Sequence, residues 1–432
     1  MKLRLVCRHW KRLVDGNSTL MERAAIMLPK RVELDRDFHP ERLPPTASLR
    51  IAASKIFWVN SWWPQAGRKL VHLKLSHCTV SSLTLYGMLG QTPQLKSLHL
   101  NSVEISINSK VMPNVRLDAC EELSIDQDHH CDFILKLDCP RLKRFEADVK
   151  RENVKTFLAR VSDTLEELTT SLPAEVMLGV LEQLKHLTLL KIGTTDQYFA
   201  NIFARLGLQL INLKILNLTL LYSCAWSSSH SLSLLNLRSF LKLETLCVRG
   251  TGTRMMPMYF NELAHRSLKS IRLINVDLAE AGLEQYISRS DSIRSMTFQD
   301  CAFSSWPQMF TAIGVHCQSL QHLDVTNCAS RSYESCSSVV DYFDELRYLK
   351  LWNATLPTNA LKMLFRVCPN VEQLHLEGAE SIDDDALSTL RQKMKRLKWL
   401  FLWGVRISSE KQRHIAESFS QQRVIINGSA IL

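Results

Sequence analysis

Apolar residues recur along this 432-residue chain in a short phrase of the form L-x-x-L-x-L. Clear copies run over residues 95–100, 320–325, 346–351, 371–376 and 397–402. Fourteen copies begin at residues 70, 95, 120, 142, 165, 187, 213, 243, 268, 293, 320, 346, 371 and 397, with successive spacings of 22 to 30 residues. A period of this length is the signature of a solenoid, in which each repeat stacks on its neighbours.

The pattern within and between the phrases predicts the elements of each repeat. The last two apolar residues of a phrase are two apart, which is the β-strand period, so both point to the core and the residues around them point to solvent. Stretches between phrases have helical spacing, as in residues 258–265, 278–290, 359–367 and 385–394. Pro357 precedes one of these stretches, and Asp383 and Asp384 precede another, as expected at helix starts. We therefore predict an α/β leucine-rich-repeat solenoid, each repeat a strand plus a helix, with parallel strands on the concave face and helices on the convex face.

Composition and cysteine usage agree with such a fold. The chain is 46% apolar and 22% charged, the balance of a globular protein with a large core. No run of 18 apolar residues and no signal-peptide pattern occur, so we expect no membrane contact, a cytoplasmic or nuclear location, and reduced cysteines. Cys78, Cys301 and Cys328 hold the ninth place of their repeats, where valine or alanine stands elsewhere, which indicates a small buried slot.

Some repeats begin in a characteristic way. Cys139 and Cys368 are each followed by proline at the start of a phrase, and Cys317 begins a variant of this pattern. Together with cysteine in the ninth place, these phrases resemble the C-P-x-L-x-x-L-x-L-x-x-C pattern of the cysteine-containing repeats in F-box proteins.

The N-terminal residues give a second resemblance. Leu3, Val6, Trp10 and Leu13 fall on one stripe of a basic helix, which could simply cover the first repeat. The same residues also match the pattern L-x-x-V-C-[KR]-x-W-[KR]-x-L, so the segment resembles the closing helix of an F-box. The resemblance implies that these four residues contact a Skp-type adaptor of a cullin ubiquitin ligase.

An F-box normally opens with L-P-x-E and two further helical segments, and Met1 falls inside its last part. We therefore expect residues 1–16 to be the C-terminal part of an F-box, 17–45 a connector, and 46–432 the solenoid with a C-terminal cap. The resemblance implies a non-catalytic substrate-recognition subunit of an SCF-type ubiquitin ligase, monomeric apart from that complex, that docks if the full F-box exists upstream. The alternative is a ligase-independent scaffold that binds proteins.

Other signals favour no chemistry. Residues 128–131 spell the D-H-H-C motif of protein acyltransferases, but that chemistry needs a zinc-binding domain between membrane helices. The spacing of His129, His130, Cys131 and Cys139 matches no zinc framework, so we expect no metal, no cofactor and no enzyme. The net charge of +10 favours an acidic partner, but the basic residues are dispersed beyond the N-terminus, so we do not expect nucleic-acid binding.

The solvent-facing strand positions are the candidate partner surface. Early repeats place acidic residues there: Glu122, Asp126, Glu146, Asp148 and Glu167. The predicted substrate-binding residues come from later repeats: Arg249, Arg272, Tyr348, Lys350, Trp352, His375, Trp399, Phe401 and Trp403. Aromatic residues at such positions are enriched where partners anchor. For the last repeat a cap is the alternative, because the tail 423–432 is apolar enough to cover Trp399 to Trp403.

Overall fold

The computed structural model describes sixteen stretches of the chain: residues 25–28, 30–38, 46–106, 113–126, 132–147, 152–195, 205–221, 239–252, 255–257, 267–279, 291–332, 343–354, 356–377, 382–404, 409–427 and 429–430. The chain divides into two compact units, Met1–Ile192 (unit 1) and Gly193–Leu432 (unit 2). The F-box-like segment with Leu3, Val6, Trp10 and Leu13, the motif at 128–131, and Asp148 all lie outside the described residues.

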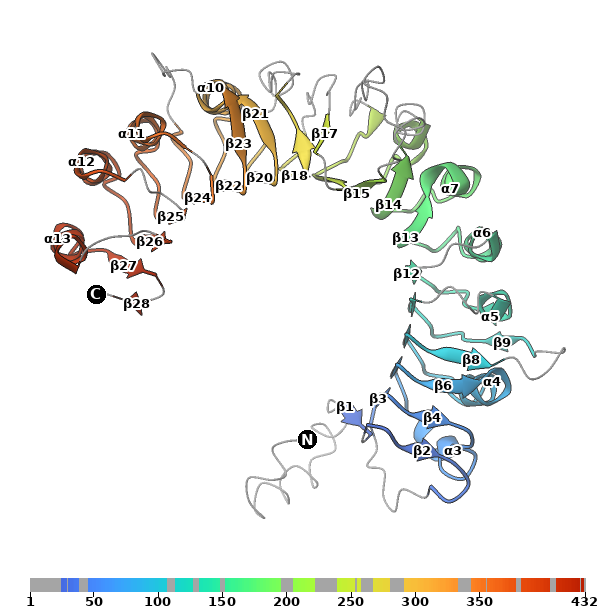
Figure 1. The fold of residues 1–432 in the computed structure, drawn as a ribbon. Coiled ribbons are helices and arrows are strands. Elements are labelled where there is room, and N and C mark those ends of the chain that lie inside the picture. Colours follow the sequence, from blue (N-terminus) through green and yellow to red (C-terminus); the bar gives the residue numbers. More distant parts are fainter. Residues whose placement is uncertain are drawn as a thin grey trace. The chain divides into compact units, whose positions relative to one another are not determined.

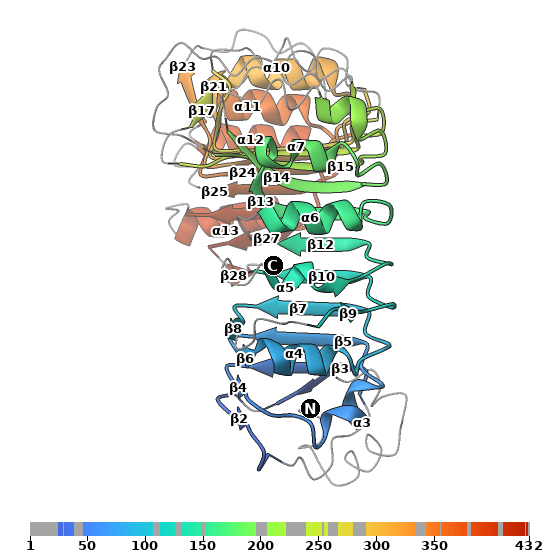
Figure 2. The same ribbon diagram turned by 90° about the vertical axis from the view of Figure 1, so that its right-hand side faces the viewer.

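Unit 1 is a ladder of parallel strands, drawn one above another in Figure 2. They pair in the order β1, β3, β5, β7, β10, β12 and β13. Leu49, Leu73, Leu98 and Leu123 are register partners and are at most 1% exposed, so the leucine column of the sequence is the core. The bounds are β1 Ala25–Met27, β3 Ser48–Ala52, β5 His72–Ser76, β7 Ser97–Asn101, β10 Glu122–Ile125, β12 Arg144–Ala147 and β13 Glu167–Pro173.

The other side of unit 1 carries helices and a second set of short strands. The helices are α3 Trp63–Gly67, α4 Ser82–Leu89, α5 Asp132–Leu135, α6 Glu152–Arg160 and α7 Ala174–Leu181. The short strands are β2 Glu33–Leu34, β4 Lys55–Ile56, β6 Thr79–Ser81, β8 Glu104–Ser106, β9 Val115–Arg116 and β11 Leu137–Asp138. Strands β1 and β2 fall in the range 17–45, which we expected to be a connector, and β1 extends the ladder through its parallel pairing with β3.

Unit 2 has the same construction. Its strands β15, β16, β18, β20, β22, β24, β25, β26 and β27 pair in parallel in that order, and β28 pairs antiparallel with β27. Within this unit the strands lie on the inner side of its curve and the helices on the outer side (Figure 1). The ladder bounds are β15 Ile215–Leu221, β16 Thr245–Gly250, β18 Ser270–Ile274, β20 Ser295–Gln299, β22 His322–Thr326, β24 Tyr348–Trp352, β25 Gln373–Glu377, β26 Trp399–Trp403, β27 Arg423–Ile426 and β28 Ser429–Ala430.

The remaining elements complete the leucine-rich-repeat fold. The helices of unit 2 are α10 Trp306–His316, α11 Thr358–Val367, α12 Asp384–Lys393 and α13 Ser409–Ser418. Its short strands are β17 Met256–Pro257, β19 Val276–Asp277, β21 Ala302–Ser305 and β23 Ala329–Ser332, and β14 Leu189–Thr195 spans the boundary between the units. None of the helices in the described part of the chain has the length and apolar character needed to cross a bilayer.

The helices predicted at 359–367 and 385–394 are confirmed as α11 and α12. Pro357 is the N-cap residue of α11, and the Asp383 carboxylate caps α12 by accepting a hydrogen bond from the backbone N–H of Ala386 at 2.6 Å. The prediction of one helix per repeat is too general. In the described residues between β7 and β10 the chain forms the short strands β8 and β9 and no helix, and β9 pairs instead with β11.

Several ladder strands turn toward the outer side through a residue with left-handed backbone. In unit 2 this position holds Asn275, Asp300, Asn327 and Asn353, with φ between 48° and 55°. Asparagine and aspartate tolerate this conformation better than other non-glycine residues. Their side chains also bond along the stack, because the Asn327 amide donates to Asp300 at 3.0 Å and the Asn353 amide donates to Asn327 at 3.1 Å.

The residue after this turn enters the core, and here the slot predicted for cysteine is confirmed. Cys78, Cys301 and Cys328 are buried free thiols. Each Sγ donates to backbone carbonyl oxygens at 3.3–3.5 Å, including the oxygen of the residue two positions earlier. A thiol fits this slot because it is small, weakly polar and able to donate one weak hydrogen bond.

Candidate functional site

The outward positions of four strands of unit 2 gather aromatic rings. Parallel register places equivalent positions of β22, β24, β25 and β26 side by side. The aromatic side chains at these positions are all partly exposed, so the surface is neither part of the core nor fully exposed to solvent. We define the aromatic surface as His322, Tyr348, Trp352, His375, Trp399, Phe401 and Trp403.

Successive rings of this surface stack on one another. The His322 and Tyr348 rings are parallel within 5° at a centroid distance of 4.1 Å, and the His375 and Phe401 rings within 8° at 4.0 Å. Tyr348 and His375 connect the two pairs at 5.1 Å. The strand spacing of about 4.8 Å brings register partners within stacking distance. The result is two stacked pairs joined by a contact tilted by 39°, which together form one continuous row of rings over four strands.

An ion pair is set into the stack. The Lys350 Nζ donates to the Asp324 carboxylate at 3.2 Å, and the two side chains are only 23% and 19% exposed. The Thr326 hydroxyl also donates to Asp324, at 2.7 Å. Lys350 lies 5.4 Å from the centre of the Trp352 ring, within cation–π range. The Lys350 ammonium is therefore already held by an acidic neighbour.

The histidines of the stack favour their neutral form. Burial lowers the pKa of His322, while Asp324 opposes the shift. Burial also lowers the pKa of His375, and the charge of Lys350 adds to the effect. Burial, together with the Asp324 charge, raises the pKa of the Tyr348 phenol. Near neutral pH the stack is therefore an uncharged aromatic face.

Glu377 is the exception on this face. It lies on β25, where it is the register partner of Trp403 on β26. On the other side of β25, Trp352 is the residue of β24 that follows Leu351, the register partner of Leu376. The two indole rings are 6.1 Å apart with an angle of 41°. The Oε2 atom of Glu377 is buried and makes no hydrogen bond in the described structure. Burial raises the pKa of this carboxyl, and Lys350 opposes the shift.

The tail after the last repeat both extends and borders the surface. Strand β27 pairs with β26, with Arg423 opposite Trp399 and Ile425 opposite Phe401. The Arg423 guanidinium lies 4.7 Å from the centre of the Trp399 ring. The tail thus continues the ladder by one strand. Trp399, Phe401 and Trp403 nevertheless remain partly exposed beside it.

The structure brings most of the predicted site residues together. Tyr348, Lys350, Trp352, His375, Trp399, Phe401 and Trp403 lie on three adjacent strands, β24 to β26. Arg249 and Arg272 do not join them. Both are exposed on β16 and β18, and Arg272 bonds to Gln299 at 3.5 Å. Strand β18 is three ladder steps from β24, or roughly 14 Å at the normal strand spacing.

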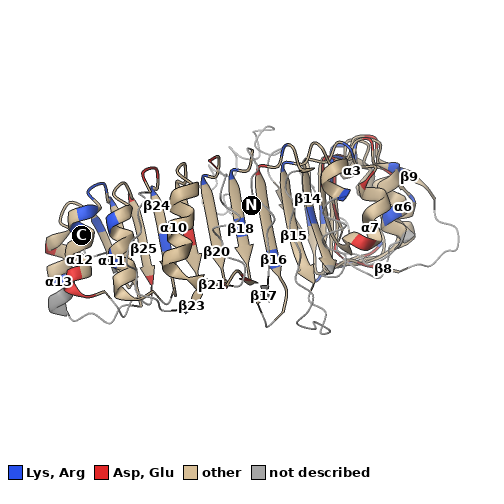
Figure 3. Cartoon of the chain, turned by 90° about the horizontal axis from the view of Figure 1, so that it is seen from above, with Lys and Arg blue, Asp and Glu red and all other residues tan. Residues whose placement is uncertain are grey.

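Three further residues of this site were not among the sequence predictions. They are His322, Asp324 and Glu377. Each occupies an outward position of its strand, so the two-residue period could have found them. Their residue types alone do not distinguish them from the many other polar residues at outward positions. Figure 3 shows that charged residues are sparse on the strands of unit 2 and denser on its helices and turns, which makes this small charged group distinct.

The outward face of unit 1 has a different character. Glu122 accepts a hydrogen bond from Arg144 at 3.2 Å and lies 3.7 Å from His99. Ser97 bonds to His99 at 2.9 Å. Burial alone would raise the pKa of Glu122, but the Arg144 hydrogen bond and the His99 charge hold that pKa below its ordinary value. Glu122, one of the predicted acidic positions, thus pairs with basic neighbours within a polar network.

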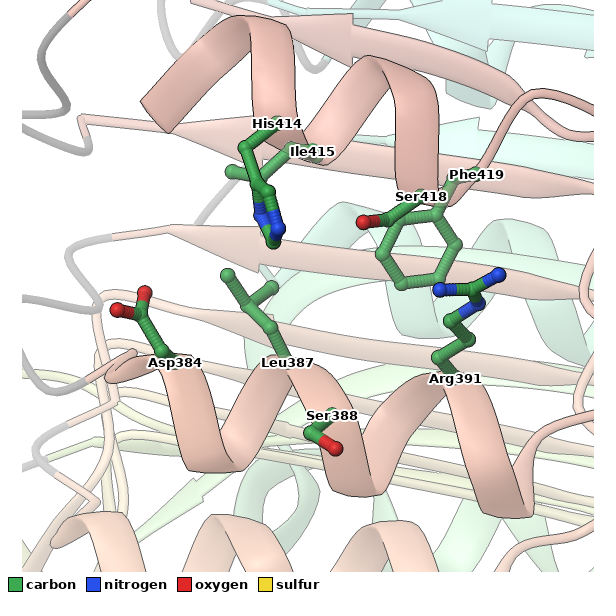
Figure 4. A pocket seen from close by; sticks show the side chains of 8 residues that line it. All are labelled: Asp384, Leu387, Ser388, Arg391, His414, Ile415, Ser418 and Phe419. Atoms are coloured by element: carbon green, nitrogen blue, oxygen red, sulfur yellow. The ribbon is translucent and has the colours of Figure 1, made fainter. Parts of the chain in front are cut away.

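A pocket between α12 and α13 was considered as a second site (Figure 4). It has a volume of about 140 Å³ and includes Asp384, Ser388, His414 and Ser418, the residue types of a hydrolytic triad. Figure 4 shows the Ser388 hydroxyl turned away from His414, and Ser388 instead accepts a hydrogen bond from Gln392 at 3.4 Å. The volume is below that of ligand sites, which hold roughly 300–1,000 Å³. The nucleophile–base contact of a triad is not formed here.

No grouping of three or more histidine, cysteine or acidic side chains suited to a metal ion occurs among the described residues. Cys139, one of four residues considered as a metal ligand set, is buried and 1% exposed. The other three lie outside the described stretches.

Comparison with known proteins adds the following. No protein-family model and no curated protein matches this chain. Among solved structures, it is similar to a leucine-rich-repeat protein of Leptospira interrogans, with 14% identity and a TM-score of 0.39 over 84% of this chain and 91% of that one.

Two further similar structures come from complexes. One chain of the yeast Rad7–Elc1 complex has 14% identity and a TM-score of 0.39, over 92% of this chain and 81% of that one. One chain of the mouse RP105–MD-1 complex has 12% identity and a TM-score of 0.47, over 91% and 78%. The leucine-rich-repeat assignment of the present chain rests on its own strand ladders.

Proposed function

We propose that this chain is a non-catalytic binding protein that holds a protein partner on the aromatic surface of unit 2. The observation that carries the proposal is the continuous stack of partly exposed rings from His322 to Phe401. Rings fixed by stacking lose little freedom when a partner covers them, and aromatic side chains dominate binding hot spots. An ordinary solvent-facing strand surface has no need of such a stack.

Within this function, we propose the role of substrate-recognition subunit of an SCF-type cullin ubiquitin ligase. The support is the resemblance of residues 3–13 to the closing helix of an F-box and of the C-P repeats to those of F-box proteins. In this role Leu3, Val6, Trp10 and Leu13 contact a Skp-type adaptor, given a complete F-box upstream. The aromatic surface then holds the protein substrate.

The second candidate is a ligase-independent scaffold. The observation that favours it is that the aromatic surface lies wholly within unit 2 and uses no residue of the F-box-like segment. A scaffold would bind the same partner without an adaptor.

Co-purification with the adaptor separates the two roles. The chain would be expressed from its own transcript, including any in-frame upstream segment, and the Skp-type adaptor would be measured in the purified complex. The ligase role predicts adaptor in the wild type, its loss in Trp10→Ala, and its retention in Tyr348→Ala. A wild type that recovers the protein partner without adaptor supports the scaffold and overturns the ligase role.

A further inference from the structure

The carboxylate of Glu377 on the aromatic surface is buried at a cost in free energy. Glu377 holds a buried oxygen that makes no hydrogen bond in the described structure, and its flanking strands carry Trp352 and Trp403. Burial of an ionised oxygen without a donor is unfavourable, because water no longer solvates it. Glutamine, or an apolar residue, at this outward position would avoid the cost. The arrangement therefore calls for a group that compensates the charge.

Among the described residues, three cations of this region have other partners. The Lys350 Nζ donates to Asp324. The Arg423 guanidinium lies over Trp399. Lys398 forms an ion pair with Glu372, which directly precedes strand β25 and lies five residues before Glu377. None of these three cations hydrogen-bonds to the buried Oε2 atom of Glu377, so this carboxylate is available to a cation of a partner.

The surrounding rings specify the kind of cation. Trp352 and Trp403 have their centres 6.1 Å apart and are inclined by 41°, so a small cation near their junction lies within about 6 Å of both faces. Indole is the ring that attracts cations most strongly. A guanidinium is planar and weakly hydrated, and it can stack on an indole while its N–H groups donate to a carboxylate. An ammonium is more strongly hydrated and lacks the planar fork.

We propose that Trp352, Glu377 and Trp403 form a receptor for a single arginine side chain of the protein partner. The inference rests on the proposed binding function and specifies the partner's chemistry at one point of the aromatic surface. Partial exposure of all three residues leaves them accessible to a partner. The arginine would pair with the accessible part of the Glu377 carboxylate and cover the two indoles, while the stack from His322 to Phe401 holds the neighbouring apolar residues. The net positive charge of the whole chain does not oppose this, since the local charge at Glu377 is negative.

Titration with short peptides tests the receptor directly. The full chain, with its nine tryptophans labelled with ¹⁵N, would be titrated with acetyl-Gly-Arg-Gly-amide and with the same peptide carrying citrulline, the uncharged isostere of arginine. Trp352→Phe and Trp403→Phe assign the two indole N–H signals. We expect both signals to shift with the arginine peptide, at a Kd at least tenfold lower than with the citrulline peptide.

Glu377→Gln and Glu372→Gln form the matched pair of variants. Glu377→Gln should bring the two peptides within twofold of each other. Glu372→Gln removes a carboxylate that already pairs with Lys398 and should leave the tenfold preference intact. Equal binding of both peptides by the wild type overturns the receptor, as does a preference unaltered by Glu377→Gln in a folded protein. Tighter binding of the corresponding lysine peptide would overturn the assignment to arginine.

The receptor and the proposed function fail in different ways. Loss of partner binding in Tyr348→Ala, together with equal binding of the arginine and citrulline peptides, retains the proposed function and rejects the receptor. A partner that binds Tyr348→Ala and Trp399→Ala as tightly as it binds the wild type rejects the proposed function itself, whatever the peptides do.

Discussion

The two units are each built on a ladder of parallel strands, and they differ in what the outward side of that ladder presents. In unit 1 the outward positions of β7, β10 and β12 form a polar network in which Glu122 is satisfied by Arg144 and His99. In unit 2 the equivalent positions of β22 to β26 form an aromatic stack in which Glu377 is left unsatisfied. One face compensates its own charges, whereas the other presents half-exposed rings and one uncompensated charge.

This difference separates the parts of the sequence that specify the fold from those that specify binding. The buried columns are interchangeable between units, because Leu123 and Leu374 have the same environment and are both fully buried. The outward columns face no such constraint, so they vary freely. A surface that pairs its own charges has less to gain from a charged partner than a surface that leaves a carboxylate without an ion pair.

The largest expected effect concerns the shared ladder. Leu374→Ala in unit 2 and Leu123→Ala in unit 1 should each lower the free energy of unfolding by about 2–5 kcal/mol, from lost burial plus the cavity left behind. Both leucines are 0% exposed. Urea unfolding followed by circular dichroism measures the change. A loss well below 1 kcal/mol in either unit would show that its ladder is not a packed core.

The next effect should occur in unit 2 alone. Trp352→Ala should weaken binding of the protein partner by about 2 kcal/mol or more, roughly 30-fold, as expected for an aromatic hot spot. Because Trp352 is partly exposed, the unfolding free energy should change by less than about 1 kcal/mol. Affinity is measured by calorimetric titration with the partner. His99→Ala in unit 1 is the control and should leave the affinity unchanged. A large loss of stability with unchanged affinity would place Trp352 in the core.

The ladder was the part of this molecule that the sequence made predictable. The strand period and the repeat length located the buried leucines, the cysteine slot and two helices, because these depend on short-range spacing. The strands β1 and β3 were harder to find, since Ala25–Met27 and Ser48–Ala52 lack a full L-x-x-L-x-L phrase and join the ladder through pairing with the next repeat.

The site was predictable only in part. The outward period found the aromatic residues of β24 to β26, but not how they stack or which of them are satisfied. The roles of Asp324 and Glu377 depend on neighbours one repeat away on each side, at contacts between side chains that spacing alone does not specify. Whether an acidic residue is paired or left alone is a property of the packed surface, as the contrast of Glu122 with Glu377 shows.

A smaller effect should distinguish these two carboxylates through stability. Glu377→Gln should raise the unfolding free energy near neutral pH by about 0.5–1 kcal/mol, the lower part of the range for an unsatisfied polar group because the residue is partly exposed. The pKa of Glu377 is raised in the folded state by burial. Its cost is therefore absent below the ordinary pKa near 4.5, grows as the pH rises, and is complete above the folded-state value. Urea unfolding at pH 4 and pH 7 measures this. An advantage for the variant that is larger at pH 4 than at pH 7 would contradict the assignment.

The smallest effect should have the opposite sign. Glu122→Gln should lower the unfolding free energy near neutral pH by about 0.2–1 kcal/mol, the range of partly exposed ion pairs. Although burial alone would raise it, the folded-state pKa of Glu122 lies below its ordinary value because of Arg144 and His99. The stabilisation is thus complete above the ordinary pKa and is lost as the pH falls through the lowered one. The unfolding free energies of wild type and variant should therefore become equal as the pH falls. Added salt should reduce the difference between these two free energies at pH 7. If Glu377→Gln and Glu122→Gln change the unfolding free energy in the same direction, the proposed difference between the paired carboxylate of unit 1 and the unpaired carboxylate of unit 2 has no energetic basis.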